Sequence, residues 1–195
     1  MVVIITGASH VGKTLLAQRM LEKYKIPYLS VDHLKMGLIR SGYTELTPED
    51  DDLLTDHLWP VVREMIKTAI ENEQSLIVEG CYVPFDWRQS FTETYLSKIR
   101  FVCLAMTEGY ISDHYEDIRD HGSDIENRLD DSGLSADWIK EENRRYIEGF
   151  ENAGERIVLI NEDYEGALDG ILEDALLCGS DLICRRSRNC YPINL

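Results

Sequence analysis

The sequence has few basic residues and no long apolar run. Lysine and arginine number 20 against 36 aspartates and glutamates, which leaves a formal net charge of −16. Nucleic-acid and anionic-membrane surfaces need a cationic footprint, so we expect neither as a partner. No apolar stretch approaches the ~20 residues of a transmembrane helix. The opening MVVIITGASH lacks a basic leader and therefore predicts a strand, not a signal peptide.

Cysteine is too sparse for a disulfide framework. The chain has five cysteines, an odd number, and Cys81 and Cys103 lie in or beside apolar runs. A reduced, buried thiol is the usual state in such runs, which predicts a reducing, cytoplasmic location. The segment 179–195 is locally basic and is expected to lie on the acidic body or on a second subunit, so monomer and homodimer both remain open.

Short apolar runs alternate with helical patterns along the chain. With 195 residues and 44% apolar content, we expect one domain over 1–178, followed by a tail at 179–195. The runs are rich in β-branched residues and lie at 2–7, 28–32, 75–80, 99–106 and 156–161. This alternation predicts an α/β fold in which helices cover both faces of a parallel sheet.

Two longer helical patterns follow the second and fourth runs. In the segment 48–73, Thr47 is the expected N-cap and Pro48 the first helical residue, and Pro60 is expected to divide the segment into a helical pair. A second long helix is expected over about 135–152.

The stretch GASHVGKT follows the first apolar run and precedes an amphipathic helix. It satisfies G-x-x-x-x-G-K-[ST], the pattern of a phosphate-binding loop, in the expected strand and helix context. Backbone N–H groups of such a loop surround phosphate oxygens at a helix N-terminus. Lys13 would reach the β- and γ-phosphates, and Thr14 would offer its hydroxyl to Mg²⁺. The candidate nucleotide-binding residues are Gly7, Ala8, Ser9, His10, Val11, Gly12, Lys13 and Thr14.

Two further runs end in carboxylates. The second run along the chain, at 28–32, leads into LSVDHLKMGLIR, which supplies Asp32 and then two cations, Lys35 and Arg40. Asp32 can orient or deprotonate an acceptor hydroxyl; the alternative is that it only caps a helix beginning at His33. Glu79 ends the third run, where it can hold a Mg²⁺-bound water or an acceptor hydroxyl.

From the phosphate loop, the Asp32 segment and the stretch IRDHGSDIENRLDD, residues 1–178 resemble the P-loop kinases of small molecules. These include nucleoside-monophosphate kinases and the shikimate-kinase-like and 2-phosphoglycerate-kinase-like groups. The resemblance implies a three-layer P-loop NTPase fold with a five-stranded parallel sheet in the order 2-3-1-4-5. It also implies acceptor-binding helices at about 33–73 and a helical lid at about 113–135. In that lid, Arg119 would stack on the nucleobase and Arg128 would approach the transferred phosphoryl group. One of Arg144 and Arg145, with Arg145 preferred, would face the site from the next helix.

The sequence also departs from adenylate kinases. Glu79 and Gly80 replace their D-G pair, and Arg88 lies farther downstream than their arginine, so AMP is not the preferred acceptor. The Asp32 segment is more similar to shikimate-kinase-like and zeta-toxin-like proteins.

We therefore expect an ATP- and Mg²⁺-dependent kinase of a small, anionic alcohol. Asp32 and Glu79 would lie on the acceptor side, and the acceptor's anionic group would bind Lys35, Arg40 and Arg88. One alternative is a nucleoside-monophosphate kinase. A second is a nucleotide switch or NTPase module without a small acceptor, although the chain has no N-K-x-D motif of the kind that selects guanine.

Overall fold

The structure, a computed structural model, describes residues 1–120 and 134–177. Its centre is a five-stranded sheet in the order β2-β3-β1-β4-β5, and each paired strand is parallel to its neighbour. The strands are β1 (Val2–Gly7), β2 (Tyr28–Ser30), β3 (Leu76–Glu79), β4 (Ile99–Met106) and β5 (Ile157–Ile160). The sheet and its order are those expected from the sequence, so the fold prediction is confirmed.

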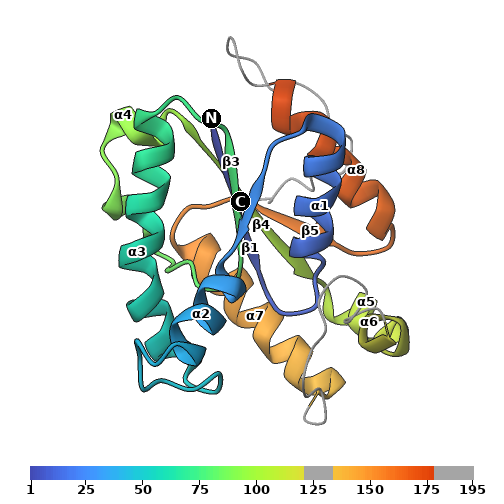
Figure 1. Cartoon of the computed structure of the whole chain (residues 1–195). Coiled ribbons are helices and arrows are strands. Elements are labelled where there is room, and N and C mark those ends of the chain that lie inside the picture. The colour runs from blue at the N-terminus through green and yellow to red at the C-terminus, as the bar shows by residue number, and fades with distance from the viewer. Residues whose placement is uncertain (121–133, 178–195) are drawn as a thin grey trace.

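Helices cover both faces of this sheet (Figure 1). The helices α1 (Lys13–Tyr24) and α8 (Tyr164–Leu177) pack together on one face, whereas α3 (Asp51–Glu71) and α7 (Ala136–Asn152) cover the other. The shorter elements are α2 (Val31–Arg40), η1 (Trp87–Ser90), α4 (Glu93–Leu96), α5 (Glu108–Asp113) and α6 (Tyr115–Asp120). In the parts of the chain that the structure describes, the helices are all too short or too polar to span a bilayer.

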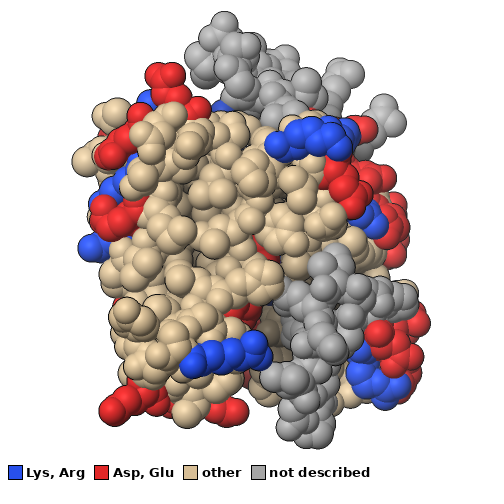
Figure 2. Space-filling model, viewed as in Figure 1, with Lys and Arg blue, Asp and Glu red and all other residues tan. Residues whose placement is uncertain are grey.

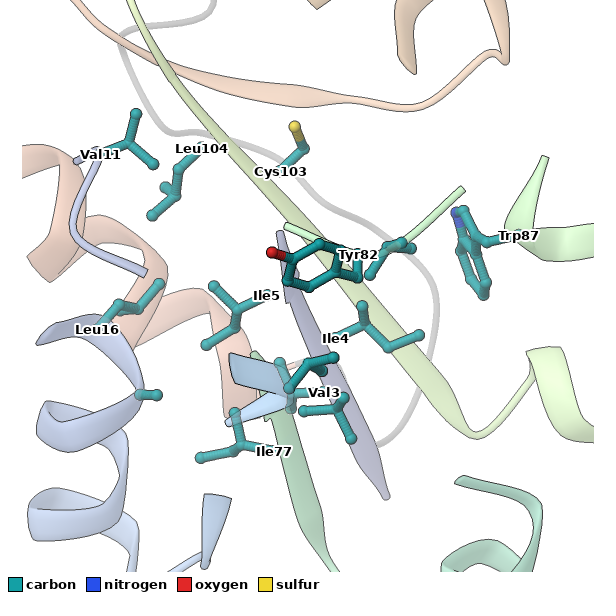
Figure 3. Packing of buried hydrophobic residues seen from close by; sticks show 14 of the residues in the cluster. Val3, Ile4, Ile5, Val11, Leu16, Ile77, Tyr82, Trp87, Cys103 and Leu104 are labelled. Atoms are coloured by element: carbon teal, nitrogen blue, oxygen red, sulfur yellow. The ribbon is translucent and has the colours of Figure 1, made fainter. Parts of the chain in front are cut away.

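The core lies on both sides of β1. All six residues of this strand are buried, as expected for the central strand of a parallel sheet whose two faces are covered. Figure 3 shows Ile5 directed toward Leu16 of α1 and Ile4 directed toward Trp87 on the opposite face. Successive side chains therefore fill both layers, and this packing holds the loop after β1 in place.

The expected division of the segment 48–73 at Pro60 is wrong. The helix α3 runs without interruption from Asp51 to Glu71, with Pro60 inside it and exposed. A proline removes one helix hydrogen bond, but the neighbouring Trp59 and Val62 are buried in the core and keep both halves of the helix on the sheet.

The expected start of this helix is also wrong. Thr47 and Pro48 precede the helix, and Asp50 is its N-cap. The backbone N–H and the hydroxyl of Thr47 both donate to Asp50 Oδ2, at 2.8 and 3.0 Å. These two bonds lower the pKa of the Asp50 carboxyl. They close a turn before the helix, which therefore begins later than its proline suggested.

Two other helix starts bear on the candidate site. Helix α2 begins at Val31 with Ser30 as N-cap, so Asp32 lies in the first turn and does not cap a helix starting at His33. Helix α7 begins as expected, because the Ser135 side chain accepts a hydrogen bond from the Trp138 backbone N–H at 3.1 Å.

Charge is unevenly distributed over the surface. In Figure 2 the centre of the visible face carries few charged side chains, and Asp and Glu gather at its margins. Part of the expected lid, including Arg128, and the tail at 179–195 lie outside the described residues.

Candidate functional site

The loop between β1 and α1 depends on two glycines. Gly7 has a φ of 140°, and a Cβ there would lie 2.0 Å from the carbonyl oxygen of Leu104 on β4. Gly12 has a φ of 86°, and a Cβ there would lie 1.9 Å from the hydroxyl oxygen of Tyr164 on α8. Only glycine fits both the left-handed backbone and the close approach. The chain can then turn sharply and begin α1 at Lys13, which points the first helical N–H groups toward the loop.

Lys13 and Glu142 bind opposite ends of one peptide unit in this loop. The buried ammonium of Lys13 donates to the carbonyl oxygen of Ala8 at 2.7 Å. The N–H of the same peptide, on Ser9, donates to Glu142 Oε2 at 2.8 Å. The phosphate loop is thus joined directly to α7, which lies far along the chain.

Thr14 and Glu79 form a second contact beside the loop. The Thr14 hydroxyl, in the first turn of α1, donates to Glu79 Oε2 at 3.2 Å. Glu79 is only 1% exposed at the carboxyl end of β3. A hydroxyl and a carboxylate are hard oxygen donors of the kind that Mg²⁺ prefers, so these two residues could hold that ion or its bound water.

A chain of polar contacts extends from α2 to α3. Asp32 Oδ1 and the Lys35 ammonium form an ion pair at 2.7 Å. Lys35 also donates to the Tyr82 hydroxyl oxygen at 2.8 Å, and that hydroxyl donates to Asp51 Oδ1 at 2.9 Å. Burial raises the pKa of Tyr82, and Asp51 and Asp32 raise it further, so the phenol keeps its proton. The sequence predicted Asp32 and Lys35 as acceptor-side residues, and the structure adds Tyr82 and Asp51 to their contacts.

Helix α7 fastens these parts to one another. The Tyr146 hydroxyl donates to the Cys81 carbonyl oxygen at 2.7 Å, and Arg145 pairs with Asp52 in the first turn of α3. The buried Asn143 accepts from the Met106 backbone N–H at 2.7 Å, at the end of β4. Neighbouring residues of one helix therefore bind the end of β4, the loop after β3 and the start of α3.

The position of Glu142 changes its acidity. Burial raises the pKa of this carboxyl, and the negative charge of Asp51 raises it further. The ammonium of Lys13 and the N–H of Ser9 act in the opposite direction, but burial is the larger effect. Glu142 therefore takes up a proton more readily than an exposed glutamate.

The other predicted cations, Arg40, Arg119 and Arg88, each have different surroundings in the structure. Arg40 is exposed at the end of α2. Arg119, at the end of α6, pairs with Glu116 at 2.5 Å and Asp120 at 3.0 Å. The structure does not bring Arg88 to the phosphate loop. It binds Glu155, just before β5, at 2.5 Å, whereas the phosphate loop follows the carboxyl end of β1.

Sequence reasoning missed Glu142, Tyr82 and Asp51. Glu142 stands among other acids in a helix that is polar over most of its surface, and Asp51 is one of three consecutive aspartates. Nothing in the pattern separates these carboxylates from solvent-facing neighbours. Tyr82 follows the Glu79–Gly80 pair closely, and its place after a parallel strand was the one available signal.

Comparison of the sequence with protein-family models finds no match, and comparison with curated protein sequences finds none either. Solved structures do resemble it. A deoxyadenosine kinase from M. mycoides has a TM-score of 0.54 at 12% identity, covering 90% of this chain and 98% of its own. A sugar kinase from a Janibacter species has a TM-score of 0.52 at 15% identity, and the match covers 88% of this chain and 92% of that one. A shikimate kinase from Bacteroides thetaiotaomicron has a TM-score of 0.51 at 17% identity, and the match covers 90% of this chain and 98% of that one. At these identities the likeness concerns the fold.

Proposed function

Because the chain has the fold of P-loop small-molecule kinases, we propose that it is an ATP-dependent phosphotransferase. It moves the γ-phosphoryl group of ATP to a small, hydroxyl-bearing acceptor, and residues 1–178 form the kinase domain. The observation that carries this proposal is that a complete phosphate loop and a polar chain from Asp32 to Asp51 are bridged by one helix. Glu142 of α7 accepts from Ser9, and Arg145 of the same helix pairs with Asp52, next to Asp51.

On the donor side, the triphosphate lies on residues 7–14. Lys13 leaves the Ala8 carbonyl for the β- and γ-phosphates, and the N–H groups at the start of α1 bind phosphate oxygens. Thr14 and Glu79 would hold Mg²⁺, which neutralises phosphate charge when bound. The nucleobase would lie near Arg119, and Arg128 would approach the transferred group. Both of these roles rest on the family resemblance.

On the acceptor side, the polar chain on α2 and α3 orients the substrate. Asp32, held by Lys35, binds the acceptor hydroxyl, and Tyr82 fixes the position of Lys35. Lys35 and Arg40 remain the proposed cations for an anionic group on the acceptor, with Arg145 nearby on α7. Arg88 is left out, because its partner Glu155 precedes β5, whereas the phosphate loop follows the carboxyl end of the parallel strand β1.

The protein is further proposed to work in the cytoplasm, where its free, buried Cys103 would stay reduced. Burial raises the pKa of this thiol to about 12, so it is protonated and unreactive at neutral pH.

An ADP-release assay tests the function directly. The panel holds phosphorylated acids, carboxylic-acid alcohols, nucleoside monophosphates, neutral sugars and amino alcohols, each with ATP and Mg²⁺. We expect turnover with one class of hydroxyl-bearing acceptor and little with water. Turnover with nucleoside monophosphates alone would support the adenylate-like alternative. ATP hydrolysis that no acceptor stimulates would instead support a switch or NTPase module.

A further inference from the structure

Glu142 places a carboxylate directly on the phosphate loop. Phosphate-loop N–H groups are donors for phosphate oxygens, yet the Ser9 N–H donates to Glu142 Oε2 at 2.8 Å. The contact is not needed to anchor α7, because Asn143, Tyr146 and the buried Phe150 already hold this helix to the sheet and the loop after β3. A half-buried acid at this point therefore calls for a chemical explanation.

The geometry puts Glu142 on the phosphate loop, one peptide unit away from the contact that Lys13 makes. In a trans peptide the C=O and N–H point in opposite directions, so Lys13 and Glu142 lie on opposite sides of the Ala8–Ser9 peptide. Lys13 is the residue that reaches the β- and γ-phosphates in this kind of loop. On the other side, Glu142 is close enough to Asp51 of α3 for that charge to raise its pKa. Glu142 thus lies on a helix that contacts the loop through Ser9 and the start of α3 through the Arg145–Asp52 ion pair.

Glu142 also differs from Asp32 and Asp51 in the group that binds its carboxylate. Asp32 is held in an ion pair with Lys35 at 2.7 Å, and Asp51 accepts a hydrogen bond from Tyr82 at 2.9 Å. The hydrogen bond of Glu142 comes from the backbone N–H of Ser9, a loop group of the kind that donates to phosphate oxygens, so a bound triphosphate would compete with Glu142 for it. Nucleotide binding would therefore release Glu142 at the place and moment of transfer.

We propose that Glu142 is the catalytic carboxylate that accepts the proton of the acceptor hydroxyl, with Asp32 orienting that hydroxyl. This assignment rests on the proposed kinase function. The acceptor O–H bond breaks and its proton passes to Glu142, while the acceptor oxygen forms a bond to the γ-phosphorus. The bond from the γ-phosphorus to the β,γ-bridging oxygen breaks, and its electron pair leaves on ADP. Glu142 then returns the proton to solvent.

The surroundings of Glu142 suit this task. A general base works best when its pKa lies near the working pH, and burial moves the pKa of Glu142 in that direction. Asp32, whose Oδ1 is bound to the Lys35 ammonium at 2.7 Å, is held in place to orient the hydroxyl.

The test compares Glu142→Gln with a matched control, Glu141→Gln, in the full chain. Glu141 is the preceding residue of the same helix, is exposed and pairs with Arg144. The glutamine in Glu142→Gln can still accept the Ser9 N–H, so the fold and the loop are kept. The measurements are kcat and kcat/KM from pH 5 to 9 with the acceptor found in the panel, and ATP affinity by calorimetry.

For Glu142→Gln we expect kcat to fall at least about 100-fold, the usual contribution of general base catalysis. ATP affinity should be unchanged or higher, because a competing negative charge is gone. The wild-type rate should fall as the pH drops through the pKa of Glu142, and this acidic limb should disappear in Glu142→Gln. Glu141→Gln should keep both the rate and the limb.

A Glu142→Gln variant that keeps its rate within about threefold of wild type overturns the assignment. A slower variant that retains the acidic limb also overturns it, because the role would then be structural. Wild-type protein that phosphorylates no acceptor overturns the proposed function itself, and this assignment with it.

Discussion

The hydroxyl of Thr14 donates a hydrogen bond to the carboxylate of Glu79 at 3.2 Å, between residues 65 positions apart in the sequence. Thr14 comes from the first turn of α1 and Glu79 from the end of β3, the neighbour of β1 in the sheet. The contact thus brings the two proposed magnesium-binding side chains together beside the phosphate loop.

The first prediction concerns this pair. Thr14→Ala removes the hydroxyl, so the Mg²⁺-dependent gain in ATP affinity should fall about tenfold or more. Thr14→Ser keeps the hydroxyl and is the matched control, with affinity close to wild type. Calorimetric titration with ATP, in Mg²⁺ and again in EDTA, measures the gain. An unchanged gain in Thr14→Ala would remove Thr14 from the metal site.

Lys13 should be essential for transfer and dispensable for folding. Lys13→Ala removes the ammonium that is to neutralise the β- and γ-phosphates, so turnover should drop at least about 100-fold. Lys23→Ala, on the last turn of the same helix, is the control and should stay near wild type. ADP release gives the rate, and circular dichroism with a thermal melt reports the fold. A folded Lys13→Ala protein with substantial activity would refute the site.

Asp32 is expected to act on the acceptor and not on ATP. Asp32→Asn removes the charge that pairs with Lys35, so kcat/KM for the acceptor should fall about tenfold or more while ATP affinity changes less than about twofold. The neighbouring, exposed His33→Asn serves as the control. Equal losses in both quantities would mean that Asp32 is structural.

Two glycine substitutions should change stability in opposite directions. Gly12→Ala places a Cβ 1.9 Å from the Tyr164 hydroxyl at a φ of 86°, and it should destabilise the fold by at least about 1 kcal/mol. Gly37→Ala, in α2, meets nothing within 4 Å and should stabilise by about 0.5 to 1 kcal/mol. Urea unfolding measures both, and a neutral Gly12→Ala would contradict the loop geometry.

Arg88 should matter for stability and not for activity. Its partner Glu155 has a side chain that is only 5% exposed, so Arg88→Ala leaves a nearly buried charge without its cation. We expect a loss of about 1 to 3 kcal/mol in the free energy of unfolding. The double variant Arg88→Ala/Glu155→Gln should recover part of this loss. The kcat per folded molecule should stay at the wild-type value, and a large fall in kcat would return Arg88 to the acceptor site.

Local patterns were sufficient where neighbours in the sequence decide the structure. The five strands, the loop GASHVGKT between the first strand and the first helix, and a helix beginning at about residue 135 were all predicted. The course of α3 was not, because the propensity of Pro60 to break a helix is outweighed by the burial of Trp59 and Val62 against the sheet. Its late start was missed because a side-chain turn between Thr47 and Asp50 competes with helix entry.

By itself, the sequence determined the class of fold and the position of the loop between β1 and α1, because Gly7, Gly12, Lys13 and Thr14 lie in one short, contiguous turn of the backbone. Only the tertiary structure decided the partners of the charges. It paired Asp32 with Lys35 and Arg88 with Glu155, and it placed Glu142 where it accepts a hydrogen bond from the backbone N–H of Ser9, 133 residues earlier in the chain. Such pairings depend on how helices and strands are stacked in space, and the free energy of a charge depends on the groups that surround it there.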